Sequence, residues 1–212
     1  MLCPPLWHEY IYSHRAYRQL GGDDDQGEIP QCLTDISTAV SEMRRRSGFA
    51  RVCLVGLRFG GTLSMMSGAE RGDLEGLVLW DPVVDGRVYL RQTRTVHEER
   101  LGRSLAKLKQ GIRNGTNLEI LGFPLTRSIA ADIEHIDLLA IRRKPANNTL
   151  VIESDAEGDQ GGLREHLERT AARVEYQQIH APRIWLPDRE GGLLVPNQIL
   201  QAVVSWMSRV QP

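Results

Sequence analysis

The sequence has few of the residues that build disulfide-bonded or metal-stabilised proteins. Its 212 residues include only three cysteines, Cys3, Cys32 and Cys53, and no two of them have the spacing of a CxxC motif or a zinc site. The histidines are scattered, without an HxH or HExxH pattern. We therefore expect no disulfide framework, no metal centre and no cofactor. Sparse, unpaired cysteines are also typical of the reducing cytoplasm.

The chain lacks an excess of charge of either sign. Its 26 basic and 27 acidic residues leave a formal net charge of -1, whereas a nucleic-acid-binding surface needs a clear basic excess. No apolar run approaches the ~20 residues that cross a bilayer. The first residues also lack the basic start and long apolar centre of a signal peptide. The sequence therefore predicts a soluble cytoplasmic protein with no nucleic-acid partner and no membrane span.

Four short stretches rich in apolar residues predict strands. Three of them end at glycine or at acidic residues, as buried parallel strands do, and the fourth alternates more: 51–57, 76–82, 148–155 and 173–179. Helices are expected between and after them, mainly from apolar spacings of three and four: 29–47, 60–69, 163–172 and 199–210. This alternation predicts an α/β fold, with a mainly parallel sheet and helices on both faces.

One domain spanning residues 1–212 is expected, because the length is within the usual range and no low-complexity linker divides the chain. The stretch 87–139 is predicted to be mostly helical and interrupts the alternation of strands and helices. We expect it to form a helical lid or an excursion over the sheet edge.

A glycine-rich turn follows the first clear strand. The run Gly56-Leu57-Arg58-Phe59-Gly60-Gly61 has the layout of the nucleophile elbow, G-x-S-x-G, whose central residue occupies a tight strand-to-helix turn. The central residue here is Arg58, and no G-x-S-x-G occurs elsewhere in the chain. A guanidinium stays protonated and cannot attack a carbonyl, but it can bind a carboxylate or phosphate through two parallel hydrogen bonds.

These segments, in this order, resemble the α/β-hydrolase superfamily, and particularly hydrolase-like proteins associated with bacterial exosortase (exopolysaccharide) gene clusters. The more distinctive segments are VGLRFGG at 55–61 and LVLWDPVVDGRVYL at 77–90; the others are CPPLWHEYIYSHRAYRQL at 3–20, ILGFPLT at 120–126 and LLVPNQILQAVVSW at 193–206. The chain departs from the family near residues 20–21, where RQL runs directly into GGDDDQGE. A strand and its turn are absent there, or residues are missing from the sequence. We expect a fold shortened on its N-terminal side.

The resemblance implies where the other catalytic groups would lie. The acid follows a late strand, where Asp155 and Asp159 are found, although a solvated acidic loop is the alternative. The base belongs in the loop after the last strand. There His180 comes about four residues early, Ile184 is nearest the expected place, and a surface role for His180 is the alternative. Trp185, in the same loop, is expected at a pocket mouth or in the core.

The resemblance also implies an oxyanion hole and partners for the arginine. The hole would use backbone amides of the first loop and of the residue after the elbow: Leu6, Trp7 and Phe59. Asp81, at its strand end, is a possible salt-bridge partner of Arg58, and Asp85 is a second candidate.

Three functions remain open. The first is a weak hydrolase acting on an ester, thioester or acyl-carbohydrate, with water activated by an acid such as Asp155. The second is a pseudoenzyme that uses Arg58 and loop amides to bind a small anionic acyl or carbohydrate-derived ligand. The third is a scaffold in which Arg58 fills the former site. Because loss of covalent catalysis costs several orders of magnitude in rate, weak hydrolysis is the most we expect. The sequence does not predict an oligomeric state.

Overall fold

The computed structural model describes residues 1–3, 29–105, 118–120, 123–154, 161–170, 173–181, 184–185 and 196–210. The chain divides into two compact units, one formed by residues 1–84 and 138–212 and the other by residues 85–137. Three predictions fall outside the described residues: the strand missing near residues 20–21, the loop amides of Leu6 and Trp7, and the candidate acids Asp155 and Asp159.

The first unit is built on a five-stranded sheet with the order β1-β2-β3-β6-β7, in which all neighbouring strands are parallel. The strands are β1 (Leu2–Cys3), β2 (Cys53–Leu57), β3 (Gly76–Trp80), β6 (Asn148–Glu153) and β7 (Arg173–Gln178). The four predicted strands all form. The predicted α/β class with a mainly parallel sheet is confirmed.

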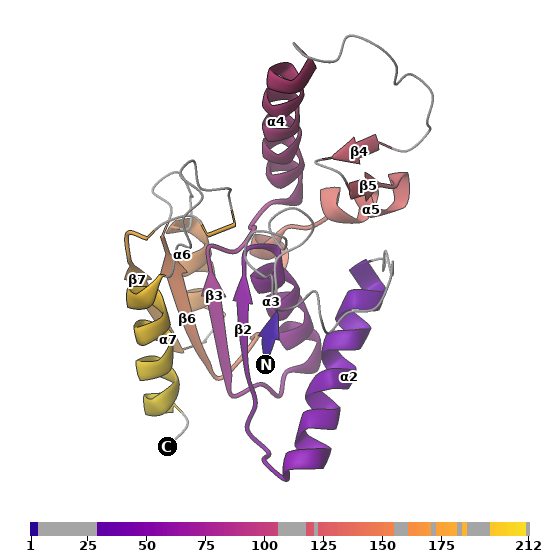
Figure 1. Ribbon diagram of the computed structural model, residues 1–212. Helices are drawn as coiled ribbons and strands as arrows, with labels where there is room; N and C mark the ends of the chain where they lie inside the picture. Colours follow the sequence, from indigo (N-terminus) through magenta and orange to yellow (C-terminus); the bar gives the residue numbers. More distant parts are fainter. Residues whose placement is uncertain are drawn as a thin grey trace. The chain divides into compact units, whose positions relative to one another are not determined.

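Helices cover both faces of this sheet (Figure 1). On one face α3 (Phe59–Arg71) packs against β2 and β3, α2 (Ile29–Ser47) packs on α3, and α6 (Gly161–Arg169) contacts β7. On the other face α7 (Asn197–Val210) contacts β3 and β6. Two-sided cover explains why the central strands are nearly continuous apolar runs in the sequence.

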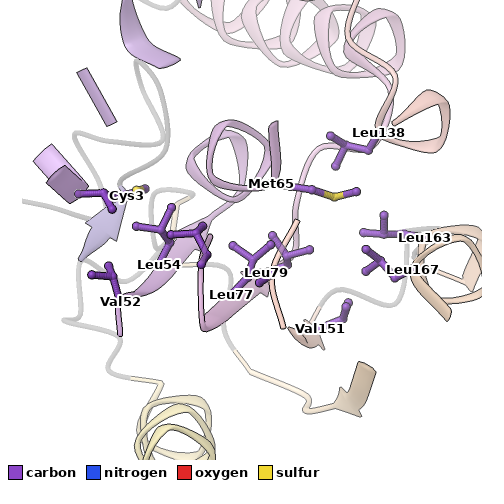
Figure 2. Packing of buried hydrophobic residues seen from close by; sticks show 13 residues of the cluster. Cys3, Val52, Leu54, Met65, Leu77, Leu79, Leu138, Val151, Leu163 and Leu167 are labelled. Carbon is purple, nitrogen blue, oxygen red and sulfur yellow. The ribbon is translucent and has the colours of Figure 1, made fainter. Parts of the chain in front are cut away.

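Alternate residues of the central strands enter two separate cores. Leu54, Leu77 and Leu79 point to the α3 and α6 side, where they form one cluster with Met65, Leu163 and Leu167 (Figure 2). Their neighbours in the strands point to the α7 side and pack with its buried residues: Cys53, Val78, Leu150, Ile152, Ile199, Val203 and Trp206. These two cores hold the sheet rigidly and fix the positions of the strand ends.

The second unit contains α4 (Gly86–Leu105), an antiparallel hairpin of β4 (Leu118–Ile120) and β5 (Phe123–Leu125), and α5 (Arg127–Glu134). The hairpin was not predicted from the sequence. α4 packs against α5, and a Cβ atom on Gly86 would lie only 1.7 Å from the carbonyl oxygen of Ile133. A lid role for this segment stays a prediction. Within the described ranges, no helix has both the length and the apolarity needed to span a bilayer.

Candidate functional site

Three neighbouring strands end at the same edge of the sheet and bring Arg58, Asp81 and Ser154 close together. The register pairs Leu57 with Trp80 and Trp80 with Ile152, so the residues that follow these strands are also neighbours. The Arg58 amide donates to the Trp80 carbonyl at 2.9 Å, and the Asp81 amide donates to the Ile152 carbonyl at 2.9 Å. The carboxyl edge of an open parallel sheet is where such folds bind ligands.

Arg58 is the single residue between β2 and α3, and its backbone is sharply bent. Its φ of 53° and ψ of -125° fall outside the regions that residues with a Cβ atom readily occupy. Its carbonyl accepts from the amides of Gly61 at 2.9 Å and Thr62 at 3.2 Å, which starts the helix immediately. The turn therefore has the strained strand-to-helix geometry of a nucleophile elbow.

Glycines allow this turn because two backbone segments touch. A Cβ atom on Gly56 would lie 2.4 Å from the Cα atom of Gly61 and 2.5 Å from the carbonyl oxygen of Gly60. A Cβ atom on Gly61 would lie 3.1 Å from the carbonyl oxygen of Gly56 and 3.3 Å from Cβ of Pro82. The close contact therefore involves the second glycine of the Gly60-Gly61 pair as well as the first.

The half-buried Arg58 side chain lies against an aromatic ring and a backbone carbonyl. Its guanidinium carbon is 5.2 Å from the centroid of the Trp185 ring, a cation–π arrangement. Its Nη1 donates to the carbonyl oxygen of Asp81 at 3.4 Å, at the long end of hydrogen bonding. Trp185 is itself buried and meets Trp80 edge-on, with ring centroids 6.4 Å apart. The guanidinium is thereby held in a defined orientation.

The carboxylate of Asp81 is engaged by Ser154. Asp81 is 1% exposed, and its Oδ1 accepts from the Ser154 amide at 2.8 Å while its Oδ2 accepts from the Ser154 hydroxyl. The indole Nε1 of Trp80 donates to the Ser154 Oγ at 3.1 Å. Asp81 also has a left-handed backbone, with φ of 43°. The backbone carbonyl of Asp81 thus contacts Arg58, and Ser154 donates to its buried carboxylate. A salt bridge between this carboxylate and Arg58 stays a prediction.

The loop after the last strand contributes an indole to this edge. His180, the weak candidate for the base, follows β7 and is exposed. Ile184, which occupies the expected place of the base, packs on the apolar core beneath α7. Its neighbour Trp185 lies over the Arg58 guanidinium. Where the family pattern implies an imidazole beside a hydroxyl, the structure has an indole beside a guanidinium.

The remaining predicted site residues lie at helix starts. Phe59 is the first residue of α3, so its amide belongs to the first turn, whose N–H groups have no acceptor within the helix. Asp85 lies in the second unit at the start of α4, where its Oδ1 accepts from the amides of Arg87 at 2.7 Å and Val88 at 3.0 Å. Oxyanion binding by Phe59 and pairing of Asp85 with Arg58 stay predictions.

Sequence reasoning did not predict the role of Ser154 and left that of Trp185 open. The register between β3 and β6 was a usable signal for Ser154, because any residue just after β6 lies beside a residue just after β3. No comparable signal existed for Trp185, whose position depends on the path of a long loop. Among the residues the structure describes, no cluster of three or more His, Cys, Asp or Glu side chains is placed to hold a metal ion.

Comparison with known proteins identifies a fold. No family model and no curated protein sequence matches this chain. Among solved structures it resembles Est1E from Butyrivibrio proteoclasticus, determined with ferulic acid bound, at 13% identity and a TM-score of 0.59 over 98% of this chain and 87% of that one. It also resembles the enol-lactonase from Burkholderia xenovorans LB400, at 15% identity and a TM-score of 0.53 over 98% of this chain and 90% of the other.

A third similar structure is the Pyrococcus furiosus esterase PF2001, at 14% identity and a TM-score of 0.56 over 90% of this chain and 66% of that one. Together these likenesses show that the chain has the α/β-hydrolase fold. At such low identity they speak for the fold alone, because one fold hosts many unrelated functions.

Proposed function

We propose that this chain is a non-catalytic member of the hydrolase fold that binds a small anionic ligand at its elbow. The observation that carries this proposal is the guanidinium of Arg58 on the strained strand-to-helix turn, with its central carbon 5.2 Å from the centroid of the Trp185 ring. A nucleophile at this corner needs a base to take its proton, but a guanidinium has no attacking lone pair and an indole accepts no proton. The nucleophile and its base are replaced by the Arg58 guanidinium and the Trp185 ring beside it.

The geometry favours a carboxylate as the ligand. A guanidinium presents several N–H groups in one plane, and two of them match the two oxygens of a carboxylate. The N-terminus of α3 starts at the same corner and adds the positive end of its dipole. Esters and lactones, the classes named for the similar structures, yield carboxylates on hydrolysis. We therefore propose the carboxylate of an acyl chain or a sugar acid.

The finer resemblance to exosortase-cluster proteins supports a carbohydrate-derived ligand and remains part of this proposal, as does a cytoplasmic location. The scaffold alternative, in which Arg58 fills the former site, remains open beside this proposal. Residual hydrolysis by water is the second candidate, favoured by the retained elbow backbone. Without covalent catalysis it would be slower than that of a serine hydrolase by several orders of magnitude.

Ligand titration tests this proposal. The full-length protein is titrated with butyrate and galacturonate, and with their uncharged methyl esters, and binding is followed by calorimetry. We expect the two acids to bind and the esters not to bind. Arg58→Gln, which keeps a polar side chain but removes the guanidinium and its charge, is expected to weaken binding by about tenfold or more, because a charge-assisted hydrogen bond is lost. Arg142→Gln is the matched control, since Arg142 is exposed in the loop before β6.

Two results would contradict the proposal. One is equal affinity of wild type and Arg58→Gln for the acids. The other is turnover of p-nitrophenyl acetate well above the buffer rate that disappears in Arg58→Ala, which would establish Arg58-dependent catalysis. Arg58→Ser is expected to gain no esterase activity, because Trp185 lies at this corner where an imidazole would be needed.

A further inference from the structure

Helix α4 of the second unit has an outward face lined by arginines. Arg87, Arg91 and Arg94 are exposed, whereas Tyr89 is buried on the opposite side of the helix. Spacings of four and three residues place the three arginines on one side of the helix, over about 10 Å of its length. No ion pair of Arg91 or Arg94 is found within the described part of the chain. We call these three residues the α4 arginine row.

The charge of this part of the chain differs from that of the whole. Residues 87–105 of α4 contain five arginines but two glutamates, whereas the full chain has a net charge of -1. A local excess of this size attracts anionic partners and accelerates their association. The second unit therefore carries a basic region on a protein that is otherwise slightly acidic.

The placement of the arginines opposes the preference of the helix. The first turns of a helix favour acidic side chains, because the unpaired amides there are positive. In α4 the arginine row occupies the first two to three turns, the first turn contains no acid, and Glu98 and Glu99 come later. Residues that oppose the local preference of a helix without adding a stabilising contact are typical of functional surfaces.

The ends of the row limit the size of its partner. At one end, Asp85 caps the helix and lies 3.8 Å from the Arg87 guanidinium. At the other end, Glu98 is exposed one turn beyond Arg94 on the same face. A continuous phosphate backbone or a plane of anionic lipids would extend over both acids and be repelled. A short segment with about three carboxylates would fit between them.

We infer that the α4 arginine row docks a short acidic segment of a partner protein. Carboxylates at spacings of four and three residues on a partner helix match the spacing of the three guanidinium groups. Val88, which is 38% exposed beside the row, offers an apolar contact to the same segment. This surface is independent of the ligand proposed for the elbow.

The test uses the full-length protein and a helical peptide with three glutamates at positions i, i+4 and i+7. The Nε–Hε resonances of the arginines are followed by NMR during the titration. We expect the signals of Arg91 and Arg94 to shift, and a peptide with glutamines in place of the glutamates to cause no shift. In Arg91→Gln/Arg94→Gln the affinity should fall about fivefold or more. Both side chains are exposed, so thermal unfolding should remain unchanged.

The matched control is Arg142→Gln/Arg143→Gln, which makes the same change in net charge at two exposed residues of the first unit. Its affinity for the glutamate peptide should stay within about twofold of wild type, since it leaves the row intact. An equal loss in both double variants, no binding of the glutamate peptide, or equal binding of the glutamine peptide would overturn the inference. Tighter binding of a DNA oligonucleotide or of phosphatidylserine vesicles through Arg91 and Arg94 would also overturn it.

Discussion

The backbone of residue 58 can be tested by comparing two substitutions, Arg58→Ala and Arg58→Gly. Both remove the guanidinium and its contact with the Trp185 ring. Only glycine also removes the Cβ atom that makes a φ of 53° and a ψ of -125° unfavourable. The difference in stability between the two variants therefore isolates the cost of the strained turn.

The expected magnitude follows from these angles. A residue with a Cβ atom in a sparsely populated backbone region costs about 1–3 kcal/mol. Glycine offsets about 0.5–1 kcal/mol of this gain, because a glycine makes the unfolded chain more flexible and so stabilises the unfolded state. Arg58→Gly should therefore be more stable than Arg58→Ala by about 1 kcal/mol, or about 2–4 °C in Tm.

Urea unfolding followed by far-UV circular dichroism measures this difference. The control pair is Gln201→Ala and Gln201→Gly, at an exposed position inside α7. There the order should reverse, with alanine more stable by about 1 kcal/mol. If Arg58→Ala proved as stable as Arg58→Gly, residue 58 would not have the strained conformation, and the elbow argument would fail.

Two further predictions concern buried groups near the sheet. Ser154→Ala should lower the free energy of unfolding by about 1–3 kcal/mol in denaturant titrations, because the buried Asp81 carboxylate loses a donor. The control Ser208→Ala, on the exposed side of α7, should change this free energy by under about 0.5 kcal/mol. Equal effects of the two substitutions would contradict a stabilising hydrogen bond between Ser154 and Asp81. Burial raises the pKa of the Cys53 thiol to about 11. Between about pH 9 and 11 the folded protein therefore keeps a proton that the unfolded chain releases. The free energy of unfolding should fall by roughly 2–3 kcal/mol over this range because of Cys53. Urea titrations across this range should show a shallower fall in Cys53→Ala, and an identical slope would refute the assignment.

The fold was predictable because its signals are local. The central strands are buried on both faces, so each is an apolar run that can be recognised without knowledge of its neighbours. The elbow was predictable for a similar reason, since the spacing of Gly56 and the Gly60-Gly61 pair reflects contact between two backbone segments close in sequence. The β4–β5 hairpin was missed, because strands of three residues carry too little pattern.

The contacts of the site were not predictable to the same degree, because they depend on distant segments. Asp81 was correctly placed at its strand end, but the sequence could not show that its carbonyl faces Arg58 while Ser154 engages its carboxylate. That outcome depends on the left-handed backbone of Asp81 and on the register with β6. The position of Trp185 depends on a loop with no regular pattern.

The corner between β2 and α3 is held by Gly56, Gly61 and backbone hydrogen bonds rather than by the side chain that it displays. The chemical group at residue 58 can therefore change without a change in the supporting framework. In such a protein the reactivity of the side chain at residue 58 and the stability of the turn that carries it are separable properties. A hydroxyl, a thiol or a guanidinium would extend from the same backbone position and differ in its reach and in what it does to an approaching molecule.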